Sequence, residues 1–111
     1  MATPMNWVNT IAAADLVSAP TSNTDPNVVD TSLLSNVALS ATFTGGSSPT
    51  MTVTVYFENA DGNFYPTGDV LTLDLADQFV YLGNPHGLVL GFTATVSGSP
   101  TDHSLYVGER A

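Results

Sequence analysis

The chain has no cysteine and no lysine, and Arg110 is its only cation among 111 residues. Without cysteine there is no disulfide, no thiolate metal site and no thiol nucleophile, so cysteine usage does not indicate a redox compartment. Ten Asp and Glu residues bring the formal net charge to -9. Proteins bind nucleic acid and anionic lipid through clusters of Lys and Arg, so the composition predicts neither as a partner.

Long apolar runs are missing as well. No stretch has the roughly 20 consecutive apolar residues that a membrane-spanning helix needs. The N-terminal sequence MATPMNWVNTIAAADLV has no basic region, and Asn9, Thr10 and Asp15 interrupt its apolar residues. We therefore expect no membrane partner, no signal peptide and synthesis in the cytoplasm.

Charge of either sign is scarce, since charged residues make up only 10% of the chain and hydrophobic residues 43%. A chain with this much apolar surface collapses, so it is not a disordered acidic tail. At this length it has room for one domain, which buries about two-thirds of the surface of the unfolded chain. We expect a single folded domain with one modest core.

Apolar and polar residues alternate in several short stretches. A period of two is typical of a strand with one face buried, because successive side chains point to opposite sides. The pattern occurs in residues 37–43, 51–58, 71–75, 88–96 and 105–107, with the sequences VALSATF, MTVTVYFE, LTLDL, LVLGFTATV and LYV.

Turn-forming sequences separate these stretches: GGSSP, DG, PTG, NPHG and SGSP. Short strands joined by such turns predict an all-β fold, an antiparallel β-sandwich or jelly roll. Residues 12–17 are the only candidate for a helix, which Pro20 would end.

The first 36 residues differ from the rest. The sequence SAPTSNTDPNVVD is rich in turn formers and has no sustained period. We interpret residues 1–36 as an extended N-terminal arm with short strands at 7–11 and 28–34, and residues 37–111 as the sandwich. Such an arm is either an edge strand with a surface loop or a strand that pairs with a neighbouring subunit.

The sequence MTVTVYFENADGNFYP raises the question of a metal or sugar site at Glu58, Asn59, Asp61 and Asn63. An EF-hand loop aligned on Gly62 would have Phe57 at its first ligand and Gly68 at its last, so the match fails. Asp61 and Gly62 instead predict a two-residue hairpin turn.

Catalytic constellations have no support beyond residue availability. Asp102, His103 and Ser104 are adjacent, so on an extended chain they point to alternate sides and cannot form a hydrolase triad with one another. His86 and His103 are isolated, and no spacing singles out a pair of carboxylates. We interpret Asp69, Asp74 and Asp77 as residues that solvate a strand and its ends. The sequence therefore predicts no enzyme, no catalytic residue, no metal and no cofactor.

Aromatic residues and the single cation are the better candidates for contact with a partner. Tyr56 and Tyr106 fall on the polar positions of their strands, which we expect to face outward. Arg110 has many possible carboxylate acceptors. Our predicted partner-binding residues are Trp7, Tyr56, Tyr106 and Arg110. An alternative is a sugar-stacking platform made of Trp7, Tyr56, Tyr65, Tyr81 and Tyr106.

Taken together, VVDTSLLSNVALSATFTGGSSPTMTVTVYFENADGNFYP and LVLGFTATVSGSPTDHSLYVGE resemble a pattern of strands and turns in phage capsid cement or decoration proteins. The resemblance covers residues 28–109. It departs from many such proteins at residues 91–95, which are neutral where basic residues are common.

The resemblance implies a jelly-roll virion protein on the outside of a capsid, made in the host cytoplasm. Its partners would be the major capsid protein and further copies of itself, as a dimer or trimer. It would stabilise the shell by binding the assembled form and not its dissociated subunits. The alternative is a carbohydrate- or receptor-binding β-sandwich module of a tail fibre or cell-surface protein.

Overall fold

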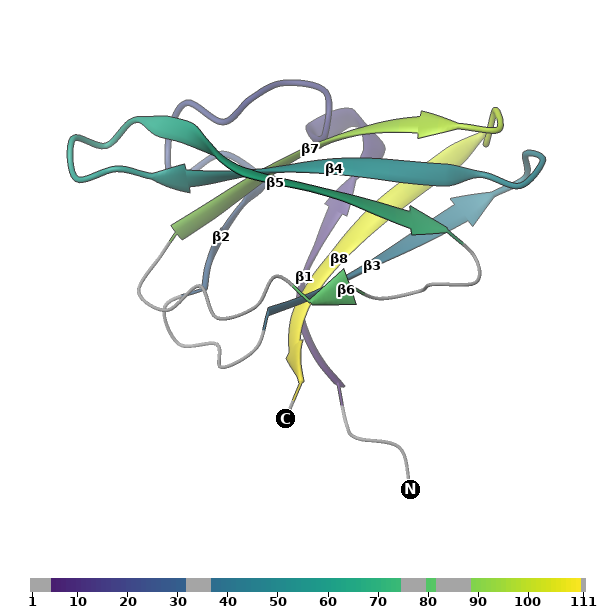
Figure 1. Cartoon of the computed structure of the whole chain (residues 1–111), viewed down its shortest axis with the longest axis horizontal. Helices are drawn as coiled ribbons and strands as arrows, with labels where there is room; N and C mark the ends of the chain where they lie inside the picture. The colour runs from purple at the N-terminus through teal and green to yellow at the C-terminus, as the bar shows by residue number, and fades with distance from the viewer. Residues whose placement is uncertain (1–4, 32–36, 75–79, 82–88, 111) are drawn as a thin grey trace.

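A computed structural model describes residues 5–31, 37–74, 80–81 and 89–110 of the chain. Two antiparallel four-stranded sheets pack face to face (Figure 1), so the predicted all-β sandwich is confirmed. The first sheet, sheet A, has the order β1-β8-β3-β6, and the second, sheet B, has the order β2-β7-β4-β5. The strands are β1 (Met5–Ala12), β2 (Val28–Asp30), β3 (Val37–Thr44), β4 (Thr50–Glu58), β5 (Phe64–Asp74), β6 (Val80–Tyr81), β7 (Val89–Ser97) and β8 (Asp102–Arg110).

The pairing of the strands defines the topology. Strand β1 pairs with β8, β2 with β7, β3 with β6 and β4 with β5. This is the pairing of one long hairpin that has been rolled up, the arrangement of a jelly roll. Because β3 also pairs with β8 and β4 with β7, the rolled hairpin closes into two sheets. The jelly-roll form of the sequence prediction is therefore the one that the chain adopts.

The core lies between the sheets and follows the alternation seen in the sequence. In residues 51–55 of β4 every second residue is buried between the sheets, and in β3 the residues between the inward ones, Ala38 and Ser40, are buried as well. Phe92 and Leu39, for example, are completely buried. The buried cluster consists of Ile11, Leu16, Val29, Val37, Leu39, Ala41, Met51, Val53, Val55, Leu73, Leu90, Phe92, Leu105 and Val107.

The strand β5 is longer than the sequence indicated. We expected a turn at Pro66-Thr67-Gly68, which is wrong, because these residues lie inside β5. Tyr56 pairs with Pro66 and Thr54 with Val70, so β5 has three residues where β4 has one, and the extra residues form a bulge. Gly68 has a φ of 93° there. Pro66 is tolerated because β5 is the outer strand of its sheet, where a missing N–H need not break a ladder.

The described part of the predicted N-terminal arm adds a strand to each sheet. Strand β1 pairs with β8 along almost its whole length, and β2 pairs with β7. Between them, the helix candidate at residues 12–17 is reduced to one 3-10 turn, η1 (Ala13–Asp15). Ile11 and Leu16, at either end of this turn, are both buried in the core. The residues of the arm that the structure describes thus belong to the sandwich.

Two loops at one end of the sandwich connect the sheets and contact each other. One joins β3 to β4 and the other joins β7 to β8, and the N–H of Ser47 donates to the C=O of Gly98 at 2.8 Å. The N–H of Thr101 donates to the C=O of Thr44 at 2.8 Å. Both loops contain a serine with positive φ before a proline, Ser48 at 46° and Ser99 at 55°. These two connections between the sheets are therefore hydrogen-bonded to each other.

Candidate functional site

Three of the four predicted partner-binding residues lie on adjacent strands of sheet A. Trp7 is in β1, and Tyr106 and Arg110 are in β8. The register pairs Trp7 with Gly108, Met5 with Arg110 and Thr10 with Tyr106. Trp7 is therefore opposite the residue midway between Tyr106 and Arg110. The pairing brings together residues that are about a hundred positions apart in the sequence.

Tyr56, the fourth predicted residue, lies in the other sheet. It is half-buried in β4 at an outward position, flanked by Val55, which is buried in the core. Tyr106 is half-buried in β8 between Leu105 and Val107, which are also buried. The two tyrosines thus face outward from opposite sheets and cannot contribute to one surface.

The hypothesis of a single platform of five aromatic residues is therefore wrong. Tyr65 pairs with Phe57 across the strands, with ring centroids 6.2 Å apart, and it is 42% exposed on β5 of sheet B, beside the β4–β5 loop. Tyr81 belongs to β6 in sheet A. The aromatics are distributed over both sheets because the chain passes from one sheet to the other after almost every strand.

Threonine dominates the outer face of sheet B. Thr52 pairs with Thr72 on one side and Thr95 on the other, and Thr54 pairs with Thr93. All have outward positions, since the alternate residues Met51, Val53 and Val55 are buried in the core. Thr50 and Tyr56 continue the outward row of β4. We call the surface formed by Thr50, Thr52, Thr54, Tyr56, Thr72, Thr93 and Thr95 the threonine face.

A segment of the η1–β2 connection, residues 16–20, lies along β7 beside this face. The N–H of Ala94 donates to the C=O of Leu16 at 2.9 Å, so the segment continues the sheet beyond β2. Leu16 is completely buried. Pro20 is also buried, and it lies over Gly91, where a side chain would overlap the proline ring.

Two polar residues hold the rest of this connection in position. The side-chain amide of Asn27, which is 3% exposed, donates to the C=O of Ser18 at 3.0 Å and to that of Phe92 at 2.8 Å. The carboxylate of Asp25 accepts from the N–H of Thr21 at 2.8 Å and from that of Ser22 at 3.2 Å. The hydrogen bond from the Thr21 N–H lowers the pKa of Asp25. The 16–20 segment is thus anchored at both ends.

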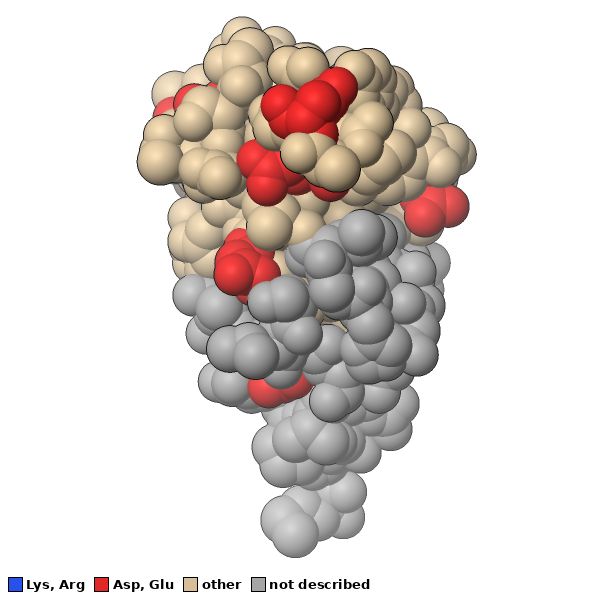
Figure 2. Space-filling view, turned by 90° about the vertical axis from the view of Figure 1, so that its left-hand side faces the viewer, with Lys and Arg blue, Asp and Glu red and all other residues tan. Residues whose placement is uncertain are grey.

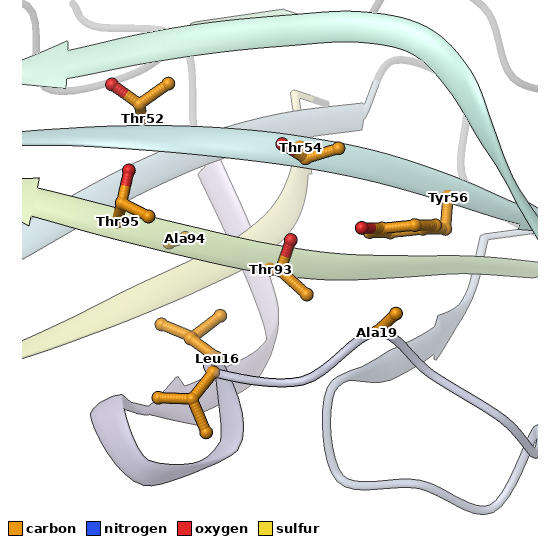
Figure 3. Close-up of a pocket in the computed structure, with 9 residues that line it drawn as sticks. Leu16, Ala19, Thr52, Thr54, Tyr56, Thr93, Ala94 and Thr95 are labelled. Carbon is orange, nitrogen blue, oxygen red and sulfur yellow. The ribbon is translucent and has the colours of Figure 1, made fainter.

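A groove of about 200 Å³ lies between the 16–20 segment and the threonine face (Figure 3). Figure 3 shows Tyr56 edge-on at one end, with its hydroxyl on the side of Thr54 and Thr93. Each described residue that lines the groove is uncharged: Leu16, Val17, Ala19, Thr52, Thr54, Tyr56, Thr93, Ala94 and Thr95. We call it the Tyr56 groove.

The hydroxyl groups of this groove have unused hydrogen-bonding capacity. Five of the lining residues carry a hydroxyl: Thr52, Thr54, Tyr56, Thr93 and Thr95. Within the part of the chain that the structure describes, these hydroxyls make no hydrogen bond to protein. Each hydroxyl can donate one hydrogen bond and accept two. The groove can therefore bind a polar, uncharged group by several hydrogen bonds at once.

The β4–β5 hairpin, where the sequence raised the question of a metal, is held by its own hydrogen bonds. The N–H of Asn59 donates to the C=O of Asn63 at 2.8 Å, so three residues and not two form the loop between this pair. The predicted two-residue turn is wrong because Gly62 has a φ of 85° but Asp61 does not enter the positive region. A three-residue loop of this kind needs positive φ only at its last residue.

The side chain of Asp61 is engaged within this loop. Its carboxylate accepts from the N–H of Asn63 at 2.9 Å, which lowers the pKa of Asp61. The hydroxyl of Tyr65 donates to the same carboxylate at 3.4 Å. Among the described residues there is no group of three or more His, Asp and Glu side chains able to hold a metal ion.

The other polar candidates lie on strands and at their ends. Asp102, His103 and Ser104 begin β8, where the N–H of His103 donates to the carboxylate of Asp102 at 2.9 Å. Asp69 is in the β5 bulge and Asp74 at the end of β5. His86 and Asp77 lie outside the described residues.

Figure 2 shows Asp and Glu spread over the end of the molecule that is on the left in Figure 1.

Sequence reasoning missed the Tyr56 groove because the 16–20 segment has no periodic pattern. Two signals were present. Gly91 interrupts a strand of large residues, which can indicate the close approach of another segment. Leu16 and Val17 are apolar residues directly before the turn-rich sequence SAPTSNTDP.

Comparison of the chain with models of known protein families finds no match. Comparisons with curated proteins and with solved structures also find none. In the part of the chain that the structure describes, no helix is long and apolar enough to span a membrane. The functional proposals therefore depend on the residues and their arrangement.

Proposed function

We propose that the chain is a non-enzymatic virion protein that binds the outside of a phage capsid and stabilises it. The observation that carries the proposal is the register of β1 on β8, which brings Trp7, Tyr106 and Arg110 into one region of sheet A. Aromatic residues and arginine are the types enriched where proteins bind one another. We infer that this region of sheet A contacts the major capsid protein.

The architecture and the charge support this reading. Jelly rolls occur in viral capsid proteins and in lectins, so the fold is compatible with this role by analogy. A net charge of -9 suits the outside of a shell, because it opposes binding to packaged nucleic acid. A single guanidinium in such a chain also gives a capsid carboxylate one bidentate contact that no other side chain here can offer.

Stabilisation would come from preferential binding to the assembled shell. A protein that binds the assembled state and not the dissociated subunits shifts the equilibrium toward assembly by mass action. Symmetry-related sites on a shell would favour a dimer or trimer of the chain. Particles that carry the chain should therefore withstand higher temperatures than particles from which it has been stripped.

Co-sedimentation tests this function directly. Intact phage heads should bind the chain in a saturable manner, while dissociated capsid subunits should not. Arg110→Gln removes the charge but keeps a polar side chain that can donate hydrogen bonds, and it should weaken binding to heads by about 10-fold or more, which corresponds to about 1.4 kcal/mol. Tyr65→Ala, which changes an exposed tyrosine on the other sheet, should bind as the natural chain does.

Circular dichroism would show that both variants fold. Equal heat resistance of stripped and decorated heads would count against a stabilising role. Purified virions that contain none of the chain would rule the proposal out.

A further inference from the structure

The Tyr56 groove belongs to the outer face of sheet B, whereas the proposed contact with the capsid belongs to sheet A. It is therefore a separate site, and its occupation does not depend on the capsid proposal. We infer that the groove binds one neutral hexopyranose unit of a glycan.

The absence of charged side chains from the described lining of the groove limits the kind of ligand that it can bind. No described residue that lines the groove is charged, and the chain as a whole carries -9. A phosphate, a nucleotide or an acidic sugar would find no cation there and would be repelled by the protein's overall field. Calcium and magnesium sites usually include carboxylate ligands, and none of these residues is Asp or Glu. The groove is therefore not suited to such a cation. The ligand that fits is uncharged.

The side chains then favour a sugar over an apolar ligand. Five of the nine described lining residues carry a hydroxyl, and none of these hydroxyls has a protein partner. An apolar ligand would bury them without hydrogen bonds, which is unfavourable. The hydroxyls of a hexose can donate to and accept from them. The C–H groups of the sugar can pack on the ring of Tyr56 and on Val17, which is 76% exposed, since both are apolar surfaces.

Size limits the ligand to one ring. The groove has a volume of about 200 Å³, below the roughly 300–1,000 Å³ of sites for drug-sized molecules. It is open to solvent on the outer face of the sheet, so further units of the glycan can extend away from it.

The groove is largely formed before any ligand binds. Its floor consists of two central strands of sheet B, β4 and β7. Its wall is anchored by the hydrogen bond between Ala94 and Leu16 and by the two bonds from the Asn27 amide. A site held in this way loses little conformational entropy when a sugar binds.

An NMR titration of the ¹⁵N-labelled full chain tests the inference. The probes are the methyl glycosides of glucose, galactose, mannose and N-acetylglucosamine, each added to about 10 mM, since a single-ring site is expected to bind in the millimolar range. At least one glycoside should give saturable shifts confined to the amides of residues 16–19, 52–56 and 93–95.

Variants distinguish the groove from the rest of the surface. Tyr56→Ala should weaken binding by about 10-fold or more, and Thr93→Val by about 3- to 10-fold, the effect of one lost hydrogen bond. The matched control is Thr72→Val, which removes a hydroxyl from the same face on β5 but does not line the groove. It should bind the sugar as the natural chain does.

Three results would overturn the inference. The first is the absence of saturable shifts with all four glycosides. The second is binding that Thr72→Val weakens as much as Thr93→Val does. The third is shifts in the groove that depend on protein concentration without sugar, since they would identify a second copy of the chain as the occupant. As a control for folding, the amide resonances outside the groove should have the same positions in sugar-free Tyr56→Ala as in the sugar-free natural chain.

Discussion

Gly91 shows how one residue decides whether the Tyr56 groove exists. It is the only residue of β7 without a side chain, and it pairs with Tyr56 across the strands. The missing Cβ leaves room for Pro20, and the proline brings the 16–20 segment against the sheet. Because Pro20 is buried, the position of the segment depends on this contact.

We expect Gly91→Ala to destabilise the chain and to displace the segment. The added Cβ would overlap the ring of Pro20, and inserting a methyl group into a packed site costs about 1–3 kcal/mol. Urea unfolding followed by circular dichroism measures the loss. A double-mutant cycle with Pro20→Ala should show coupling, because the second change removes the obstacle. Additive effects of the two changes would show that the proline does not determine the cost.

The loops between β3 and β4 and between β7 and β8 both join one sheet to the other, and they are hydrogen-bonded to each other. Gly46 and Gly98 have positive φ angles of 85° and 81°. A Cβ at Gly98 would lie 2.5 Å from the carbonyl oxygen of Ser47 and 2.8 Å from the Cα of Pro49. The glycines are therefore required both by the backbone conformation and by the closeness of the other loop.

Two glycine-to-alanine changes separate these requirements. Gly62 has a φ of 85°, much like Gly98, but a Cβ there would meet nothing within 4 Å. Gly62→Ala should cost only the left-handed backbone conformation, about 1–2 kcal/mol. Gly98→Ala should cost more, by about a further 1–3 kcal/mol, because of the steric clash. Thermal unfolding of the two variants provides the comparison, and equal losses would mean that the loops readily move apart.

At the scale of the whole molecule, the first strand pairs with the last. Strand β1 pairs with β8, so that Met5 at the start of β1 is opposite Arg110 at the end of β8 (Figure 1). Ile11 of β1 is 1% exposed in the core. The hypothesis that the arm pairs with a neighbouring subunit competes with this intramolecular pairing, and it stays a prediction for the assembled protein.

Deletion of residues 1–12 distinguishes an integral strand from an arm for a neighbour. We expect the shortened chain to be less stable and to aggregate, because the deletion removes Ile11 from the core and uncovers the edge of β8. Ile11→Ala should cost about 2–5 kcal/mol by itself, the usual range for a buried aliphatic side chain. Light scattering and thermal unfolding measure both effects. A soluble, folded monomer after the deletion would contradict the expectation and favour an arm that serves another subunit.

The sequence alone determined the class of fold and most of the core. Val53, Phe92 and Val107 belong to stretches in which apolar and polar residues alternate, and this pattern predicts that the apolar side chains face the core. The prediction does not require knowledge of which strands pair. Composition also limited the ligands, since a chain without lysine or cysteine has neither a basic patch nor a thiolate site. These properties are local, or are sums over the chain, and need no knowledge of which segments meet.

The tertiary structure decided what depends on segments far apart in the sequence. The pairing of β1 with β8 brings the backbone of Trp7 close to that of Arg110. Tyr56 and Tyr106 are separated because they belong to different sheets and each lies on the outer face of its sheet. Pro66 and Gly68 resembled a turn, yet they form a bulge because β5 lies at an edge that tolerates them. The Tyr56 groove depends on Pro20 meeting Gly91, a contact between positions 71 residues apart that no local pattern records.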